Sequence, residues 1–270
     1  MSTRHALVVG GTSGIGLGIA LSLASKGDTV VTIAGRRAQA DEIVLRLKEL
    51  SSLPHKFESV DGFELKTLQK LTAESVDILI MTQEMATIQG YTPTDDGIDQ
   101  KLQLHYFSRL YLAKLLAPLM KDGSRILTVL SAGVHDRYGD FETDFELKQH
   151  YSVKNAADAA GFYTDAGFEK LSECYPNLVV AHAAPGFVNT NWGTEMPWAI
   201  RAMIRPLQAL FGRKLETVGT TLLTALEKAP VGYSLIDQNG NIMDKSKALK
   251  HTREEKDVVW AKTMELLPKV

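Results

Sequence analysis

The sequence predicts one α/β domain built around a doubly wound parallel sheet of about seven strands. Short apolar runs alternate with segments that repeat apolar residues at helical spacing, which is typical of such a sheet. The first apolar run stops at a glycine-rich turn that leads directly into a helical segment. Neither an internal repeat nor a low-complexity linker interrupts the 270 residues. Strands joined by helices imply right-handed crossovers and a sheet covered on both faces.

The strands are expected where apolar runs end at glycine or at polar residues. The run 6–9 stops at Gly10 and the run 29–34 stops at Gly35, as buried parallel strands do. Helices are expected where apolar residues recur every three or four positions, and Gly27 ends the first of them. The other expected strands are 56–60, 77–81, 125–130, 178–183 and 233–236, and the expected helices are 15–25, 41–50, 101–120 and 156–171.

Composition and charge argue against several classes of protein. The chain has 30 Lys and Arg against 32 Asp and Glu, so its formal charge of −2 disfavours binding to nucleic acid through bulk charge. Hydrophobic residues at 44% and charged residues at 23% are typical of a soluble globular protein. Cys174 is the only cysteine, so no internal disulfide can form, which fits a reducing compartment.

The N-terminus and the hydropathy pattern predict a cytoplasmic protein without a membrane partner. Residues 1–5 are polar, and the apolar run 6–9 is too short for the hydrophobic region of a signal peptide. No stretch approaches about 18 uninterrupted apolar residues, so no membrane-spanning helix is expected. The sequence also suggests no metal site.

The turn Val9–Gly16 predicts a site for a ligand that carries a diphosphate. Glycines let the backbone turn tightly and let the diphosphate approach the start of the first helix. Free N–H groups and the positive end of the helix dipole favour an anion there. The candidate binding residues are Gly10, Thr12, Ser13, Gly14, Ile15 and Gly16. The alternative is a glycine-rich strand–helix turn that binds no ligand.

The residues after the second expected strand favour NADP(H) over NAD(H) as the ligand. In a dinucleotide-binding fold this strand ends beside the adenosine ribose, where an acidic residue holds a free 2′-hydroxyl and an arginine suits a 2′-phosphate. Arg36 and Arg37 stand here, with no acidic residue before Asp41. A solvated basic turn is the alternative. Asp61, after the third strand, is either an acceptor for the adenine amino group or a turn former before Gly62.

These motifs resemble the short-chain dehydrogenase/reductase family, which has a Rossmann-like fold, over nearly the whole chain. Residues 9–16 are similar to its glycine motif, and Asp77–Ile80 is similar to the strand that leads into its Asn-Asn-Ala-Gly motif. Ser131 ends a strand where the family places its catalytic serine. Segments 105–109 and 151–157 resemble a divergent fungal group, many members of which accompany secondary-metabolite pathways. A Pro-Gly motif implies contacts to the nicotinamide carboxamide and the diphosphate from Pro185, Gly186, Val188 and Thr190.

The chain departs from the family at the positions that carry catalysis. Met81–Glu84 replaces the Asn-Asn-Ala-Gly motif, and His105 replaces the helix-borne catalytic asparagine. No tyrosine is followed four positions later by a lysine, so the family's Tyr-x-x-x-Lys pair is missing. Counting back from Pro185 without gaps places Asn155 and Ala159 at the two positions.

Four side chains are candidates to replace the missing acid. Tyr151 shares a helix face with Lys154, and a short insertion or deletion would bring this pair into use. Ser131 should lie at the carboxyl edge of the sheet, where ligands bind, although it can also be an ordinary strand-end serine. His105 is either a site residue or a hydrogen-bonded core histidine. Asp165 is either an exposed helix residue, which is the favoured interpretation, or a site acid with a raised pKa.

The segment 191–214 is expected to form a substrate lid, because its aromatic residues and methionines offer a large apolar surface and its arginines a basic face. The alternative is an amphipathic helix packed on the body with its charged side in solvent. A helix on a membrane surface is the least favoured interpretation. The fungal group includes members that lack the Tyr-Lys pair, reduce an imine and guide a Diels–Alder cyclisation. Asp165 and Trp192 resemble residues of that subgroup, which implies that Trp192 contacts substrate.

These observations predict an atypical short-chain reductase that transfers hydride from NADPH to a bulky apolar carbonyl or imine metabolite. Ser131 would hydrogen-bond the reacting group, and Tyr151 or Asp165 would supply the proton. The alternatives are a non-redox cyclase or isomerase on a dinucleotide-binding fold, and a catalytically silent dinucleotide-binding protein. Many relatives pair through their long helices, so the resemblance suggests a homodimer.

Overall fold

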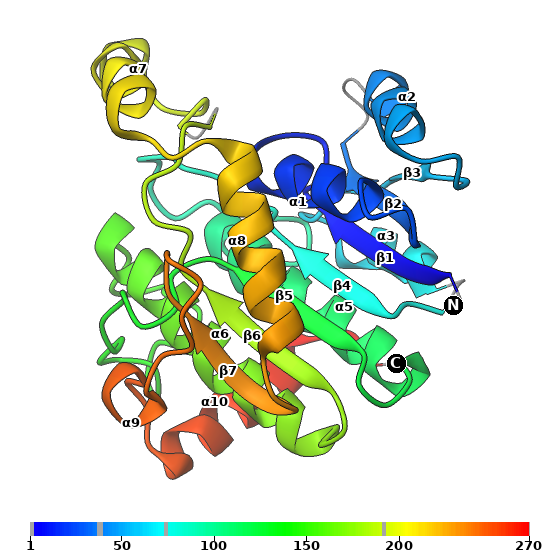
Figure 1. Ribbon diagram of the computed structural model, residues 1–270. Helices are drawn as coiled ribbons and strands as arrows, with labels where there is room; N and C mark the ends of the chain where they lie inside the picture. Colours follow the sequence, from blue (N-terminus) through cyan, green and yellow to red (C-terminus); the bar gives the residue numbers. More distant parts are fainter. Residues whose placement is uncertain (1–2, 37–39, 73–74, 191–192, 270) are drawn as a thin grey trace.

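The computed structural model describes residues 3–36, 40–72, 75–190 and 193–269. Its centre is a seven-stranded sheet in the order β3-β2-β1-β4-β5-β6-β7, and every neighbouring pair of strands is parallel (Figure 1). The predicted doubly wound parallel sheet is therefore confirmed. The strands are β1 (Arg4–Val9), β2 (Thr29–Gly35), β3 (Lys56–Ser59), β4 (Ile78–Met81), β5 (Arg125–Val129), β6 (Val179–Ala183) and β7 (Gly232–Ile236).

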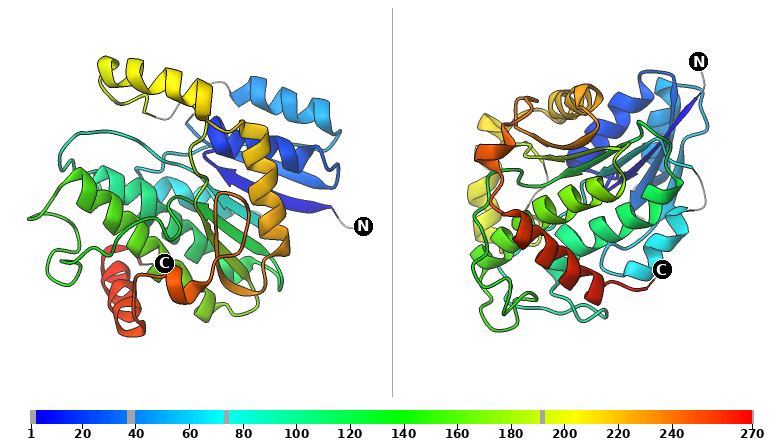
Figure 2. Two further views of the ribbon diagram at one scale, coloured as in Figure 1. Left: turned by 60° about the vertical axis from the view of Figure 1, so that its left-hand side comes forward. Right: turned by 90° about the horizontal axis from the view of Figure 1, so that it is seen from below.

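Helices cover both faces of the sheet and enclose two apolar cores (Figures 1 and 2). The α-helices are α1 (Gly14–Ala24), α2 (Ala40–Leu50), α3 (Leu65–Leu68), α4 (Gln100–Leu102), α5 (Ser108–Leu116), α6 (Val153–Cys174), α7 (Trp198–Phe211), α8 (Leu215–Lys228), α9 (Lys245–Ala248) and α10 (Arg253–Leu266). One core lies between the sheet and α1, α2 and α8, and the other lies between the sheet and α3, α5 and α6. The central strands are apolar at nearly every position because both of their faces are buried.

The helix expected over 101–120 is interrupted. After α4 the chain makes one π-helical turn over Gln103–Phe107, continues as α5, and ends in a 3₁₀ turn over Ala117–Leu119. A π turn inserts an extra residue, so it shifts the side chains before it relative to those after it. His105 lies at the middle of this turn.

The C-terminal helix α10, which the sequence analysis did not predict, packs against α6 (Figure 2). Val259 of α10 is buried in the second core. The Tyr106 hydroxyl lies 2.7 Å from that of Thr263, and Lys256 pairs with Glu169 at 3.4 Å. Part of the outer surface of α6 is therefore covered by the chain's own C-terminal helix, and that part is not free for pairing with a second copy.

The carboxyl ends of the parallel strands meet at one edge of the sheet, where the turns of the candidate site gather. α7 projects beyond this edge (Figure 1). No helix within the described ranges is both long and apolar enough to cross a membrane.

Candidate functional site

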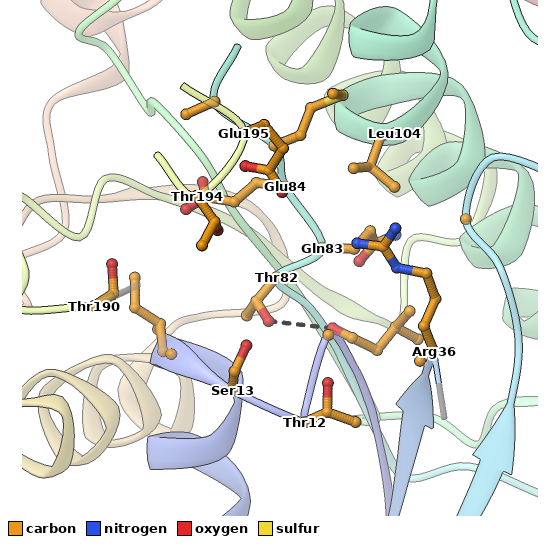
Figure 3. Close-up of a pocket in the computed structure, with 18 of the residues that line it drawn as sticks. Thr12, Ser13, Arg36, Thr82, Gln83, Glu84, Leu104, Thr190, Thr194 and Glu195 are labelled. Atoms are coloured by element: carbon orange, nitrogen blue, oxygen red, sulfur yellow. Dashed lines mark hydrogen bonds between the residues drawn. The ribbon is translucent and has the colours of Figure 1, made fainter. Parts of the chain in front are cut away.

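A cavity of about 240 Å³, here called the cleft, lies at the carboxyl ends of β1, β2, β3 and β4 (Figure 3). The predicted residues Gly10, Thr12, Ser13, Gly14, Ile15, Arg36 and Asp61 all line it. Gly10 has a φ of 82°, which lies in the left-handed region that favours glycine. A Cβ atom on Gly16 would collide with the carbonyl group of Gly10 and the hydroxyl of Thr82. The glycine turn is thus required by the close packing at the cleft floor.

Helix α1 begins at the cleft without a side-chain cap. Its N-cap residue Ser13 is extended, and the Ser13 side chain makes no capping hydrogen bond. The first turn also carries no acidic residue. The N–H groups of this turn and the positive end of the helix dipole are therefore available to an anion.

Arg36 and Asp61 occupy the far end of the cleft. Arg36 is exposed, and its guanidinium carbon lies 6.0 Å from the centroid of the Phe63 ring. Asp61 accepts a hydrogen bond of 3.0 Å from the backbone N–H of Phe63. It therefore acts as a turn former, which was one of the two roles expected for it. Arg37 and Trp192 lie outside the described residues.

Two further cavities adjoin the cleft. The second cavity, of about 630 Å³, is lined by Pro185, Gly186, Val188 and Thr190 of the predicted Pro-Gly motif. The third cavity, of about 440 Å³, has mostly apolar walls, among them Met85, Ala86, Leu130, Val134, Ala156 and Ala160. Ser131 lines both the second and the third cavity, and Glu84 lines all three.

The hydroxyl of Ser131 is buried and has no hydrogen-bond partner within the described chain. Its backbone, by contrast, is held on both sides. The N–H group of Ser131 donates to Nε2 of His182 over 3.0 Å, and its carbonyl oxygen lies 2.9 Å from Nδ1 of His135. The backbone is fixed while the hydroxyl remains free to bond a ligand.

Asp165 joins the two histidines behind Ser131. Its Oδ1 atom lies 2.6 Å from Nδ1 of His182 and accepts from the Tyr233 hydroxyl over 2.7 Å, while Oδ2 lies 3.2 Å from Nε2 of His135. The favoured interpretation of Asp165 as an exposed residue is wrong, because it is fully buried on the sheet side of α6. It also does not line the three cavities, so it acts on Ser131 only through the histidines.

The hydrogen bonds define the protonation of this cluster. His182 accepts at Nε2, so it is neutral and donates from Nδ1 to Asp165. His135 directs Nδ1 at a carbonyl oxygen, so Nδ1 carries a proton, and its Nε2 makes an ion-pair contact with Asp165, whose negative charge favours a second proton there. Burial alone would raise the pKa of Asp165 and lower that of His135. Contacts with His182 and His135 reverse the effect on Asp165, whose pKa lies below its usual value, and the contact with Asp165 reverses it for His135, whose pKa lies above its own.

Comparison with known proteins agrees with the fold and the glycine turn. The family model described as short chain dehydrogenase matches residues 4–142. The chain belongs to the short-chain dehydrogenase/reductase family. It is 30% identical over 199 residues to oxidoreductase AN1596 of Emericella nidulans. The aligned region covers 69% of this chain but only 59% of that relative.

A second relative and one solved structure extend the comparison. The chain is 26% identical over 253 residues to the short-chain dehydrogenase/reductase SAT2 of Stachybotrys chartarum, covering 82% of this chain and 72% of that one. Its fold matches an alcohol dehydrogenase from the archaeon Thermococcus sibiricus complexed with 5-hydroxy-NADP, with a TM-score of 0.64 and 12% identity. That match covers 90% of this chain and all of the other.

Tyr151 and Lys154, the candidate pair near the start of α6, have different surroundings in the structure. Lys154 is exposed and pairs with Asp158 and Asp136, so the structure does not bring it to any of the three cavities. Tyr151 donates to the carbonyl oxygen of Gln89 over 3.2 Å and does not line the third cavity. Tyr151 and Lys154 therefore do not meet as a pair.

A different lysine contacts Tyr151 in this member of the family. Lys101, at the start of the interrupted helix, donates from its ammonium group to the Tyr151 hydroxyl and, over 2.8 Å, to the Gln89 carbonyl oxygen. Its side chain is buried and lines the third cavity. Burial lowers the pKa of Lys101, and Asp99 partly offsets this. Fifty residues separate the two partners, so no local spacing in the sequence could have indicated the contact.

His105 lines the third cavity from the π turn. Its Nε2 atom accepts from the backbone N–H of Met85 over 3.0 Å, so the neutral ring carries its proton on Nδ1. Burial, with help from the nearby charge of Arg109, lowers the pKa of His105 to about 3. His105 is thus a neutral hydrogen-bonding group at physiological pH.

Arg109 organises the segment that replaces the family's Asn-Asn-Ala-Gly motif. It is fully buried, and it donates to the carbonyl oxygens of Gln83 and Val129 and to the hydroxyl of Thr128. Burial lowers its pKa to about 10, so it stays charged. Glu84 is the last residue of this segment. It lines the cavities, and protein surrounds its other sides. This enclosure raises the pKa of Glu84, although Arg109 counteracts the effect.

Proposed function

We propose that the protein is an NADPH-dependent reductase that acts on a bulky apolar compound with a C=O or C=N bond. The observation that carries the proposal is that Ser131 lines both the second and the third cavity and has a buried hydroxyl without a partner in the described chain. A buried hydroxyl without a partner costs free energy unless a ligand supplies one. A carbonyl oxygen in the third cavity would accept a hydrogen bond from this hydroxyl, and the N–H group of a protonated imine would donate one to its oxygen.

The residues of the cleft fit NADP(H). The uncapped start of α1 would hold the diphosphate, Arg36 the 2′-phosphate, and the segment Pro185–Thr190 the nicotinamide end. The carboxylates of Glu84 and Glu195 lie across the cleft from Thr12 and Ser13, so they leave the start of α1 clear for an anion (Figure 3). When bound, the cofactor supplies hydride.

Lys101 is the proton source that we assign for a carbonyl substrate. Lys101 lines the third cavity, and its ammonium group donates to the neutral oxygen atoms of Gln89 and Tyr151. A lysine whose pKa is lowered by burial is a stronger acid than an exposed one. In this assignment the family's tyrosine–lysine pair is rebuilt from two separate segments, with the lysine and not the tyrosine facing the substrate.

Glu84 favours a C=N substrate over a C=O substrate. Glu84 lines all three cavities, and its ionised form would stabilise positive charge on a reacting group. A protonated imine carries such a charge and is already activated, so it needs no further acid. The apolar walls of the third cavity suit a large hydrocarbon framework around that group.

The test is NADPH consumption by the purified protein with a panel of bulky cyclic imines and ketones. Ser131→Ala should lower kcat/KM by more than tenfold, whereas Ser22→Ala on the outer surface of α1 should leave it unchanged. Equal rates for wild type and Ser131→Ala would refute the assignment of Ser131. Product formation without NADPH consumption would instead identify a cyclase or isomerase. Failure to bind NADPH at all would contradict the cofactor assignment.

A further inference from the structure

His105 offers an unpaired N–H group to the third cavity. Its Nε2 atom accepts from the backbone N–H of Met85 over 3.0 Å, so the proton of the neutral ring is on Nδ1. Within the described chain Nδ1 makes no hydrogen bond, and it is not sealed from solvent. The ring is half-buried and lines the third cavity, so this N–H group is available to a ligand there.

The backbone on both sides of His105 fixes the orientation of its ring. His105 lies at the middle of the π turn, between Leu104 and Tyr106, whose side chains are buried. Turns of this kind inside a helix are frequent at functional sites. The hydrogen bond to Met85 joins the ring to the chain that follows β4. The N–H donor is therefore held in place before a ligand arrives, which lowers the entropic cost of binding.

The reacting group of the proposed substrate does not satisfy this donor. A carbonyl oxygen has two lone pairs, and the proposed function already pairs it with Ser131 and Lys101. A protonated imine has no free lone pair on its nitrogen, so it accepts no hydrogen bond. Ser131 also lines the second cavity, where the nicotinamide end is assigned, whereas His105 lines only the third. The N–H group of His105 therefore needs a different acceptor on the substrate.

The acceptor that fits this donor is uncharged. Burial lowers the pKa of His105 to about 3, so the ring donates a hydrogen bond but carries no positive charge. Glu84 lines the same cavity, and its ionised form would repel a carboxylate on the substrate. An amide carbonyl oxygen is a neutral acceptor with two lone pairs. Amides also resist hydride transfer from a nicotinamide, so this group would remain unchanged in the reaction.

We propose that His105 selects substrates that carry an amide or lactam carbonyl in addition to the C=O or C=N bond that is reduced. This inference rests on the proposed function, because it names a second group on the same substrate. The Nδ1–H group donates to the amide oxygen, while Ser131 bonds the reacting group. Two fixed contacts orient a framework that is otherwise held by apolar walls. A compound without the amide leaves the N–H group of His105 desolvated and unpaired, which weakens its binding.

The test is binding of two matched, unreactive ligands to the full chain in the presence of NADP⁺, which carries no hydride. One ligand is an N-methyl lactam on a fused-ring hydrocarbon framework, so its carbonyl oxygen is its only hydrogen-bonding atom. The other has an alkene in place of the amide bond and keeps the same shape. By isothermal titration calorimetry the wild type should bind the lactam about tenfold more tightly than the alkene.

Two variants of similar shape isolate the N–H donor. Asparagine and leucine branch at the same carbon, and both are too short to replace the hydrogen bond from Nε2 of His105 to Met85. Asparagine still places an N–H group near the position of Nδ1, whereas leucine has no donor. His105→Asn should keep a lactam preference of about fivefold, and His105→Leu should bind both ligands about equally. His150→Leu, at an exposed histidine outside the three cavities, is the control and should match the wild type.

The outcomes separate this inference from the proposed function. Circular dichroism should be the same for all variants, and the wild-type comparison of the two ligands depends on no variant. Failure of the wild type to bind the lactam, equal binding of the two ligands, or a preference that survives His105→Leu would overturn the inference. NADPH consumption with ketones but without a lactam preference would overturn it and leave the reductase intact. A lactam preference without NADPH consumption would support it and refute only the reductase.

Discussion

Replacing Asp165 by asparagine tests the charged cluster behind Ser131. Asparagine is nearly the same size and can still accept from Nδ1 of His182 and from the Tyr233 hydroxyl. It turns an amide group toward Nε2 of His135, however, so His135 must give up a proton. The variant therefore removes one buried charge pair while it retains two neutral hydrogen bonds.

The cost follows from these three contacts. Hydrogen bonds to a charged group contribute about 1.5–3 kcal/mol and neutral ones about 0.5–1.5 kcal/mol, so two contacts lose roughly 1 kcal/mol each. Loss of the contact with His135 adds about 1 kcal/mol, which is small because both partners of a buried pair also lose their desolvation cost. We expect Asp165→Asn to lower the unfolding free energy by about 3 kcal/mol near pH 6.

The loss should depend on pH with a definite sign. The pKa of Asp165 is lowered in the folded state, so its contribution is complete above the usual carboxyl pKa and disappears as pH falls below it. The pKa of His135 is raised, so its contribution is complete below the usual imidazole pKa and disappears as pH rises through the folded value. The difference between wild type and variant should be largest between about pH 5 and 6.5 and shrink on both sides.

Urea unfolding followed by tryptophan fluorescence at acidic, neutral and alkaline pH measures this difference. Asp257→Asn, at an exposed ion pair with Lys170, is the control and should stay close to wild type at each pH. A difference below about 0.5 kcal/mol near pH 6, or one that does not change with pH, would refute the doubly protonated state of His135. Activity provides a second readout, since a displaced Ser131 should lower kcat more than it raises KM.

Four other substitutions test the site. Arg36→Gln should weaken NADPH binding at least tenfold and leave NADH binding unchanged, as measured by quenching of tryptophan fluorescence; equal loss for both would exclude a 2′-phosphate contact. Gly16→Ala should abolish binding of both cofactors because its Cβ has no room beside Gly10, and normal titration would contradict this. With ketone substrates, kcat should fall as pH rises through the lowered pKa of Lys101. Lys101→Met should remove this decrease in kcat with pH. Permanently charged iminium substrates should show no such decrease in either protein. Arg109→Met should lower the free energy of unfolding by about 3 kcal/mol in urea unfolding, because three carbonyl and hydroxyl oxygens lose a charged donor. A loss smaller than about 1 kcal/mol would show that the segment 81–84 keeps its conformation without Arg109.

The sequence by itself determined the parallel sheet and the glycine turn, because these follow from local patterns. The apolar runs that end at Gly10 and Gly35 indicate buried strands. The right-handed crossover between these parallel strands can be predicted without knowing any contact between residues distant in the chain. The position of Ser131 at a strand end was likewise predictable, since the carboxyl ends of parallel strands share one edge.

The tertiary structure alone decided what surrounds Ser131 and which way α7 faces. His135, Asp165 and His182 come from a loop, a helix and a strand, so their contacts depend on how the sheet and α6 pack. The pairing of Lys101 with Tyr151 arises in the same way across 50 residues. Periodicity shows that α7 has a polar and an apolar side, but only packing against the body decides which side is buried. Contacts between groups that are distant in the chain leave no period in the sequence, so only the tertiary structure determines the surroundings of Ser131.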